Sequence, residues 1–449
     1  MANASTPAAE ENSGGLGFWT LLFMGTGAVI GAGIVTYVGI AVGYTGRAAW
    51  IAYAAAVLGG FLVNLPLILM CTAARIKGGN YSFMSTTCGD ILGGFYGISQ
   101  LVNVLVFSNF ALALASYLTV VFPSVPSWVF AYGSLTLFGA VNLFGTDFMA
   151  KVQNILSVIL ILGLVILGFT GIANARPDWL DIAQEGYFSN GLSGFNLAVM
   201  ALMGSTQGYT LITSFSGSCK RPKRDLPLAL CGVPIVLLVI YCSVGIAMSN
   251  VLSVEETANQ PLTAVAKVLF PNWFYYVFIF AGPVMALATT MNSSFGIFER
   301  PLCQVTDDGW LPETLSKRNK YGIAWKWIII MYFVGILPMA SGLSIATILA
   351  NTTFLSSITN ILLVIGIWRY PATMEGAWEN RSWKVSMAFF KGSCVVCLLI
   401  RLFLIWQSLK TANMAMVIGS SLALIVCLGW CYYRQKSGKV HVTKSWELQ

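Results

Sequence analysis

Four glycines interrupt the first long apolar segment of the chain, at positions 25, 27, 31 and 33. Each glycine destabilises a helix by about 1 kcal/mol relative to alanine, so the segment is prone to break near Gly31. At membrane depth, the N–H and C=O groups freed by such a break must face a polar cavity or a bound ligand. A helix that restarts at Ala32 directs its first N–H groups at an anionic group such as a carboxylate. The glycines also fit close packing against a neighbouring helix, and this segment alone does not decide between the two interpretations.

A second interruption lies in the middle of another apolar segment, at Gly204-Ser205-Thr206-Gln207-Gly208-Tyr209. Five of these six residues are small or polar, which weakens the helix there. The second interrupted segment comes five apolar segments after the first. Two interruptions at corresponding positions are the sequence sign of a carrier built from two inverted five-helix repeats. We therefore expect both breaks to line one central site.

The composition requires a membrane around these segments. The chain of 449 residues is 57% hydrophobic and only 9% charged, which is more apolar surface than a soluble fold can bury. We predict an all-α polytopic membrane protein with twelve transmembrane helices, of which the first and the sixth are broken. The predicted spans are 17–43, 48–72, 93–122, 127–145, 150–172, 194–217, 227–249, 272–298, 327–340, 343–366, 385–407 and 412–433.

Basic residues predict the orientation of these spans. Of the 25 Lys and Arg, 19 fall in segments that are cytoplasmic when the N-terminus lies inside, and four fall in outer segments. This asymmetry obeys the positive-inside rule and predicts a multi-pass protein of the cell membrane with both termini in the cytoplasm. The remaining two, Lys391 and Arg401, lie within the span 385–407. The net charge of +8 therefore reflects topology, and we expect no nucleic-acid partner.

The expected organisation is a transport core with two appended helices. We expect membrane lipid to surround both the core and the appended helices. In chain order, the expected parts are a cytoplasmic tail (1–15), a ten-helix core (16–366, with repeats of about 17–172 and 194–366), two further helices (385–433) and a second cytoplasmic tail (434–449).

Histidine is missing from the predicted spans. The only histidine, His441, lies in the C-terminal tail, so neither a metal cluster nor a Ser/His/Asp arrangement is expected in the membrane part. Cys394-x-x-Cys397 and Cys427-x-x-x-Cys431 have redox or metal spacings. Both pairs lie in apolar spans, where cysteine usually serves helix packing. We expect no enzymatic activity, no metal and no cofactor.

Five motifs, taken in their order and spacing, resemble the amino acid–polyamine–organocation superfamily of secondary transporters. They are Gly27-Ala-Val-Ile-Gly31-Ala-Gly33, Lys77-Gly-Gly-Asn-Tyr81, Lys151-Val-Gln153, Lys220-Arg-Pro-Lys-Arg-Asp-Leu-Pro227 and Asp308-Gly-Trp-Leu-Pro312. The resemblance implies a five-plus-five inverted-repeat fold with two further helices. It also implies alternating access and a central site for an amino acid.

The resemblance further implies which residues bind the substrate. The N–H groups of residues 31–33 would hold the substrate carboxylate, and the backbone carbonyls of Val29, Gly204 and Gln207 would receive its α-amino group. With the residues of the unwound segments and of the side-chain pocket included, the full set is Val29, Gly31, Ala32, Gly33, Asn103, Phe107, Gly204, Ser205, Gln207, Gly208 and Ser294.

The side-chain pocket of the family falls, by spacing, at Asn103, Phe107 and Ser294. Several positions depart from the family pattern, and two of them bear on coupling. Leu160 replaces a lysine of many proton-coupled members, and Thr210 replaces a frequent glutamate. In addition, none of the 17 Asp and Glu lies in the middle of a predicted span, so a buried cationic substrate would lack a compensating carboxylate.

We accordingly expect transport of neutral amino acids by exchange, with little dependence on pH. The alternative within transport is an antiporter of polyamines or basic amino acids. The alternative from another class is a membrane sensor that binds the same ligand without turnover. The outer loop between the third and fourth spans lacks the cysteine that tethers a heavy subunit in some animal relatives, so we expect no disulfide-linked partner.

Overall fold

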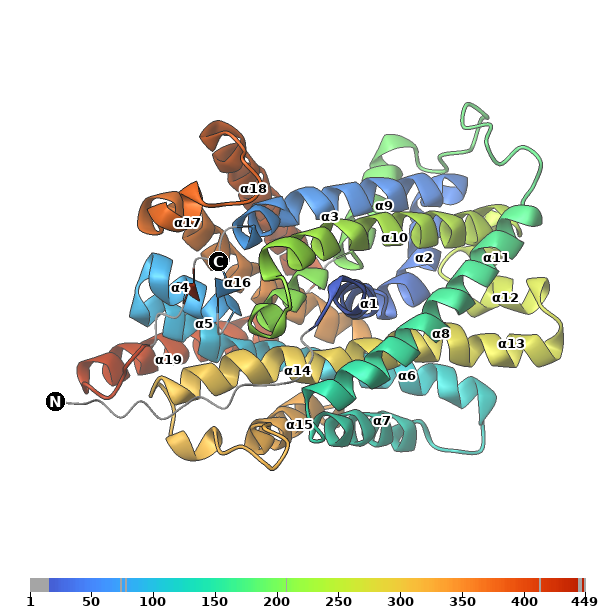
Figure 1. Ribbon diagram of the computed structural model, residues 1–449. Helices are drawn as coiled ribbons and strands as arrows, with labels where there is room; N and C mark the ends of the chain where they lie inside the picture. Colours follow the sequence, from blue (N-terminus) through green and yellow to red (C-terminus); the bar gives the residue numbers. More distant parts are fainter. Residues whose placement is uncertain are drawn as a thin grey trace.

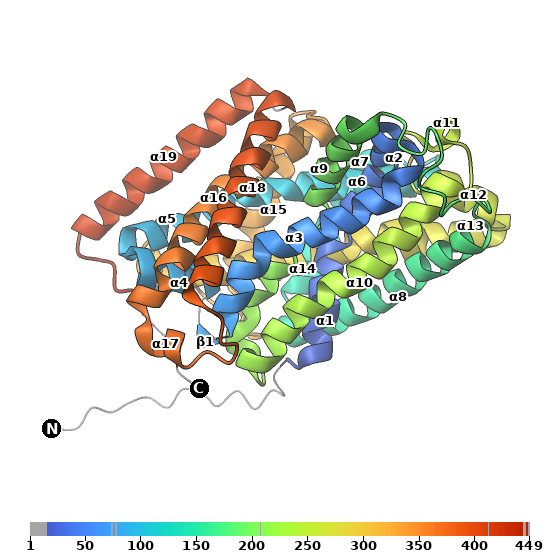
Figure 2. The same cartoon turned by 90° about the horizontal axis from the view of Figure 1, so that it is seen from above.

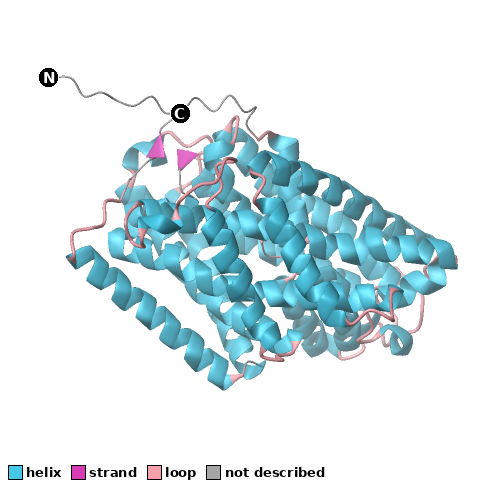
Figure 3. Ribbon diagram, turned by 90° about the horizontal axis from the view of Figure 1, so that it is seen from below, coloured by secondary structure: helices cyan, strands magenta, loops and turns pink. Residues whose placement is uncertain are grey.

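A computed structural model of the chain describes residues 16–72, 75–76, 79–206, 208–411, 413–442 and 446–447. Nearly all of these residues are helical (Figure 1, Figure 3). Eight helical segments of the described chain are long and apolar enough to cross a membrane, and three further apolar helices are shorter. The predicted class, an all-α polytopic membrane protein, is confirmed.

Each predicted span coincides with one helix or with consecutive helices. These helices are α1 (Phe18–Val29), α2 (Ala32–Thr45), α3 (Ala49–Cys71), α5 (Asp90–Asn103), α6 (Phe107–Val121), α7 (Ser127–Asn142), α8 (Thr146–Ala173), α9 (Gly191–Gly204), α10 (Pro222–Asn250), α13 (Asn272–Ile279), α14 (Met285–Asp307), α15 (Trp325–Ala340), α16 (Ile345–Thr373), α18 (Met387–Thr411) and α19 (Met414–Lys436). The division of the core into two inverted repeats stays a prediction.

Short elements join or interrupt the long helices. The 3₁₀ segments are η1 (Gly46–Ala48), η2 (Val104–Val106), η3 (Tyr209–Ser218) and η5 (Glu313–Leu315), and η4 (Phe280–Val284) is a π-helical turn. The other short elements are the helices α4 (Gly79–Cys88), α11 (Val254–Thr257), α12 (Thr263–Leu269) and α17 (Glu375–Glu379) and the strands β1 (Arg75–Ile76) and β2 (Trp446–Glu447).

The glycine-rich helix α1 lies at the centre of the bundle, where it packs against α8, α10, α14 and η3 (Figure 1). Two of its glycines are required by this packing. A Cβ on Gly25 would lie 2.8 Å from Cγ2 of Val233, and one on Gly27 would lie 2.5 Å from Oγ of Ser157. The packing interpretation of the glycines therefore holds for these two positions.

The two C-terminal helices lie at one side of the bundle (Figure 2). α18 packs against α3 and α16, and α19 packs against α5 and α16. Large apolar side chains on their outer faces, such as Trp406 and Ile425, are exposed, as expected of surfaces that face lipid. Because α18 adjoins α16, one face of α18 is turned toward the interior of the core.

The helix α4 lies at one end of the bundle, in a loop for which the sequence predicted no element. There, Tyr81 donates a hydrogen bond to Oδ2 of Asp308 at 2.6 Å, and Nε1 of Trp310 donates to the Tyr81 hydroxyl at 2.9 Å. The backbone N–H of His441 donates to the carbonyl of Asp308 at 3.0 Å. At the same end, β1 and β2 pair antiparallel (Figure 3). The described part of the predicted C-terminal tail is thus packed against the core.

The opposite end of the bundle is tied together by Arg47, which lies between α2 and α3. Its guanidinium donates two hydrogen bonds of 3.0 Å to the carboxylate of Asp178 and one of 3.0 Å to the side-chain oxygen of Asn250. These hydrogen bonds from Arg47 lower the pKa of the Asp178 carboxyl below its ordinary value. Arg47, in η1 after α2, therefore joins the loop that follows α8 to the last residue of α10.

Candidate functional site

The first predicted break is present and is two residues long. α1 ends at Val29, Ile30 leaves the helical conformation with φ −72° and ψ 91°, and α2 restarts at Ala32. Gly31 is the N-cap residue of α2, and no side chain accepts a hydrogen bond there. Because the first turn of a helix has no intrahelical acceptors for its N–H groups, this turn is a ready binding site for an anion.

Thr290 of α14 supports the break from the side. Its hydroxyl lies within hydrogen-bond distance of three carbonyl oxygens, those of Gly27 (3.3 Å), Ile30 (3.4 Å) and Ala286 (3.0 Å). A hydroxyl that donates to the end of α1 satisfies part of the backbone freed by the break. A Cβ on Gly31 would lie 2.6 Å from Oγ1 of Thr290, so any side chain here would displace this hydroxyl.

The second predicted break is also present. α9 ends at Gly204, Ser205 and Thr206 form a turn, and the chain continues as the 3₁₀ segment η3. Gly208 has φ +116°, a left-handed conformation that favours glycine. The carbonyl oxygen of Ala28 would lie 3.2 Å from a Cβ on Gly208. Gln207, predicted to offer its carbonyl, lies outside the described residues.

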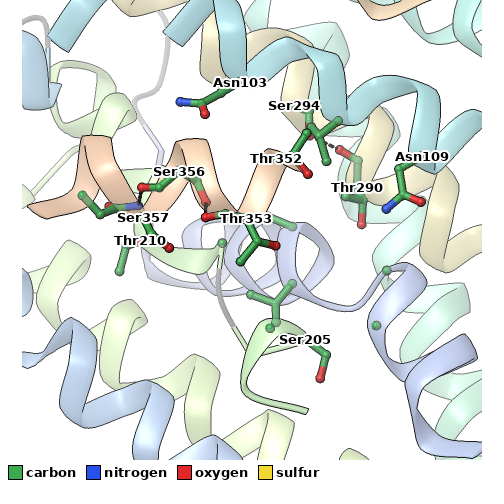
Figure 4. A pocket seen from close by; sticks show the side chains of 18 of the residues that line it. Asn103, Asn109, Ser205, Thr210, Thr290, Ser294, Thr352, Thr353, Ser356 and Ser357 are labelled. Atoms are coloured by element: carbon green, nitrogen blue, oxygen red, sulfur yellow. Dashed lines mark hydrogen bonds between the residues drawn. The ribbon is translucent and has the colours of Figure 1, made fainter. Parts of the chain in front are cut away.

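The two breaks meet at one cavity. A Cβ on Gly33 would clash with Cβ of Ser205, so the first turn of α2 is in direct contact with the turn that follows α9. A cavity of about 280 Å³ opens beside them, with walls from α1, α2, α5, α6, α9, η3, α14, α16 and α18. Figure 4 shows part of this wall, with labelled side chains from α16 (Thr352, Thr353, Ser356, Ser357), α5 and α6 (Asn103, Asn109), and α14 (Thr290, Ser294).

Most of the residues expected to bind substrate lie at this cavity. The wall includes Val29, Gly31, Gly33, Asn103, Gly204, Ser205, Gly208 and Ser294. Ala32 lies between two of them and provides the first backbone N–H of α2. The geometry therefore gathers the expected residues, while the role of each in binding stays a prediction.

Phe107 is the exception. It is fully buried behind the wall, where its ring packs against Phe295 at 4.6 Å and Phe298 at 5.9 Å between ring centres. The physical reason is the 3₁₀ segment η2 just before it. A 3₁₀ helix has 3.0 residues per turn and an α-helix has 3.6, so three 3₁₀ residues rotate the following helix by roughly 60° relative to a continuous α-helix. This rotation moves Phe107 away from the helix face that carries Asn103. Val106 and Phe110 line the cavity instead.

Two groups of wall residues were not among the predicted binding residues. The first is a row of hydroxyl and amide side chains on α16: Thr352, Thr353, Ser356, Ser357, Thr359 and Asn360. Their signal was visible in the sequence, because so many polar residues within one span mark a surface turned to a cavity or a partner helix. The second is Arg401, on the appended helix α18.

The described residues of the wall are mostly neutral. They comprise glycines, apolar side chains, hydroxyls, phenols and amides, and Arg401 is the one with a formal charge at neutral pH. The described part of the chain contains no group of three or more His, Cys, Asp or Glu that could hold a metal ion. The arrangement offers an anion-binding helix end, nearby backbone carbonyls and neutral polar side chains, which together suit a small polar solute.

A model of the family described as amino acid permease matches residues 16–430. The chain belongs to the amino acid permease family. The predicted resemblance to the amino acid–polyamine–organocation superfamily is thereby confirmed, and the chain is a multi-pass membrane protein of amino acid transport.

Two relatives of this permease carry specific names. The branched-chain amino acid permease BcaP of Bacillus subtilis is 23% identical over 342 residues, which cover 70% of this chain and 71% of the relative. The L-asparagine permease of Salmonella typhimurium is 23% identical over 386 residues, which cover 80% of this chain and 76% of the relative. Among solved structures, a mutant of the manganese transporter of Eremococcus coleocola matches with a TM-score of 0.59 and 14% identity, covering 96% of this chain and 97% of the other. The similarity to this solved structure shows that the two chains share a fold.

Proposed function

We propose that this permease carries amino acids across the cell membrane by alternating access and holds the substrate α-carboxylate at the first turn of α2. The observation that carries the proposal is the uncapped N-terminus of α2 at the wall of the cavity. The N–H groups of Gly31, Ala32 and Gly33 are the donors, and the helix dipole adds a favourable interaction with the negative charge. Gly31 and Gly33 have no side chain that would cover these donors.

The substrate ammonium group is proposed to bind carbonyl oxygens at the ends of α1 and α9. The last carbonyls of a helix lack intrahelical partners and carry the negative end of its dipole. Val29 and Gly204 are the last residues of these two helices, and both lie at the cavity. The carbonyl of Gln207 remains a third proposed acceptor. The two broken helices thus supply complementary charges to the two ends of a zwitterion.

The substrate side chain is proposed to lie against Asn103 and Ser294. Both residues are largely buried at the cavity wall, and they come from different elements, α5 and α14. The described wall offers no carboxylate, and Arg401 adds a positive charge. These features favour neutral or acidic substrates over polyamines and basic amino acids, because a desolvated cation needs a compensating partner.

The orientation in the membrane is proposed from the distribution of basic residues. Both termini are assigned to the cytoplasm, because 19 of the 25 Lys and Arg fall on that side. Residues 17–172 and 194–366 are proposed as inverted repeats that rock around the central cavity. The positions of the two breaks, in α1–α2 and α9–η3, support this division.

Uptake into liposomes tests the proposed function and its mode. We expect preloading the liposomes with unlabelled amino acid to stimulate uptake of labelled amino acid several-fold, because a carrier that returns loaded crosses faster than an empty one. We also expect little change between pH 6 and 8, since the described cavity wall contains no carboxylate or histidine to titrate. Concentrative uptake into empty liposomes driven by an imposed pH gradient would contradict the exchange mode. Saturable binding without any uptake would instead support a sensor.

A further inference from the structure

Arg401 brings a positive charge to the wall of the central cavity. The residue lies on α18 and is only 7% exposed, and Leu404, one turn further along the helix, lines the same cavity. Arg401 follows Met387, the first residue of α18, by 14 positions, or about 21 Å at 1.5 Å per residue. In a hydrocarbon core about 30 Å thick, this position is well inside the membrane.

The described neighbours of the guanidinium include three polar groups without a formal charge. They are the thiol of Cys397, which accepts a hydrogen bond from Arg401, and the phenols of Tyr96 and Tyr209, all neutral at physiological pH. The other described residues of the cavity wall are also neutral. Neutral dipoles stabilise a buried cation without cancelling its charge, so the described wall as a whole is positive.

A positive wall has a direct consequence for binding. An ionisable residue inside a membrane is costly, and it is typically found where a pathway or a ligand uses it. The guanidinium has five N–H donors in a planar fork that matches a carboxylate in two parallel hydrogen bonds. Such charge-assisted pairs are about twice as strong as neutral hydrogen bonds, and they are strengthened further by the low dielectric of the site.

We propose that Arg401 binds the side-chain carboxylate of an acidic amino acid and so determines the specificity of this permease. The inference rests on the proposed function, in which the α-carboxylate occupies the first turn of α2. The substrate then has two anionic groups and one cationic group, and the site has two positive features, the helix end and Arg401. The expected substrate is L-aspartate, L-glutamate or both.

The wild-type protein provides the first test, because each acidic amino acid has a neutral amide of nearly the same shape. Purified full-length protein in liposomes is given labelled L-glutamate or labelled L-glutamine, and the unlabelled acids and amides compete. We expect the acids to compete at concentrations at least about tenfold lower than those of the amides, the effect of one charge-assisted hydrogen-bonded pair.

Two substitutions and a matched control locate this preference. Arg401→Gln is expected to remove the preference for acids while competition by the amides changes little, and Arg401→Lys is expected to retain part of it. The control is Lys391→Gln on the same helix. Lys391 lies with its ammonium 5.1 Å from the ring centre of Trp368 and is not part of the cavity wall, so its replacement is expected to leave the preference unchanged.

The outcomes separate this inference from the proposed function. If no amino acid of a full panel enters the liposomes, the proposed function fails. If amino acids enter but acids and amides compete equally in the wild type, the role of Arg401 is overturned while transport stands. Equal losses for acids and amides in Arg401→Gln would also overturn it, because they indicate a structural role or a role in binding the α-carboxylate. If Arg401→Gln is not monodisperse, the role of Arg401 is tested instead by the competition of acids against amides in the wild type and by the preference that Arg401→Lys retains.

Discussion

Replacement of Gly31 by leucine is expected to abolish amino acid uptake while the protein still inserts and purifies as a monodisperse species. A Cβ at this position would already lie 2.6 Å from Oγ1 of Thr290, and the rest of the leucine must occupy space beside the first turn of α2. The N–H groups proposed to hold the substrate carboxylate would then be covered. The measurement is uptake of labelled amino acid into liposomes, together with the elution profile and thermal stability of the purified variant.

The control for Gly31→Leu is Gly419→Leu, the same chemical change on the exposed face of α19. No atom lies within 4 Å of a Cβ built on Gly419, so this variant is expected to transport normally. If Gly31→Leu binds and transports with near-normal affinity, Gly31 has only a packing role. If it fails to purify as a folded protein, Gly31→Ala provides the same test with less bulk, and it is expected to lower uptake in part.

A size series at Gly204 is expected to close the cavity step by step. No neighbouring atom lies within 4 Å of a Cβ built on Gly204, and the residue lines the cavity. A side chain added there extends into the space proposed for the substrate and meets no packed neighbour first. We expect Gly204→Ala to reduce uptake of the larger accepted amino acids by about tenfold, the usual discrimination for one added methyl group, and Gly204→Leu to abolish uptake.

Gly133→Leu on α7 is the matched control for this series, because its Cβ also meets no atom within 4 Å and it faces away from the cavity. Thermal stability should be nearly the same for all three variants, since none of them creates a clash. Full activity of Gly204→Leu would show that the substrate binds elsewhere. A large drop in its stability would show that the space beside Gly204 is needed for packing.

The positions of both helix breaks could be predicted from the sequence because their energetic cost is high. A break at membrane depth needs residues that tolerate unusual backbone conformations and a cavity that takes up the freed groups, and few sequences meet both conditions. Gly31 and the segment from Gly204 to Gly208 meet them. The neighbouring Gly25 and Gly27 look the same in the sequence, but in the structure they lie inside α1 and serve packing, whereas Gly31 lies at the break.

The side-chain pocket was harder to predict. Spacing along the sequence placed Phe107 in the pocket together with Asn103, but the 3₁₀ segment Val104–Val106 rotates the helix between them. Nothing in the composition of this apolar run distinguishes a 3₁₀ turn from an α-helix. Its short length and small change in backbone angles leave no pattern in the sequence.

Arg401 was missed for a different reason. Its span was assigned outside the ten-helix core, so its charge was not considered part of the site. In the structure, α18 packs against α16 and α3 and brings Arg401 to the cavity. Long-range packing of this kind depends on which helix faces meet, and the weak periodicity of a nearly uniform apolar span does not specify them. The preference for neutral substrates predicted from the sequence therefore gives way, in our proposal, to a preference for acidic ones.

The requirement for the α-carboxylate tests the central claim of the account most directly. In competition against a labelled amino acid, each amino acid that competes is compared with the amine that lacks only its α-carboxylate. If the N–H groups of Gly31, Ala32 and Gly33 hold this carboxylate, the amine is expected to compete at least about a hundredfold more weakly, because two or more charge-assisted hydrogen bonds are lost. Competition by the amines at the same concentrations as the amino acids would contradict the account.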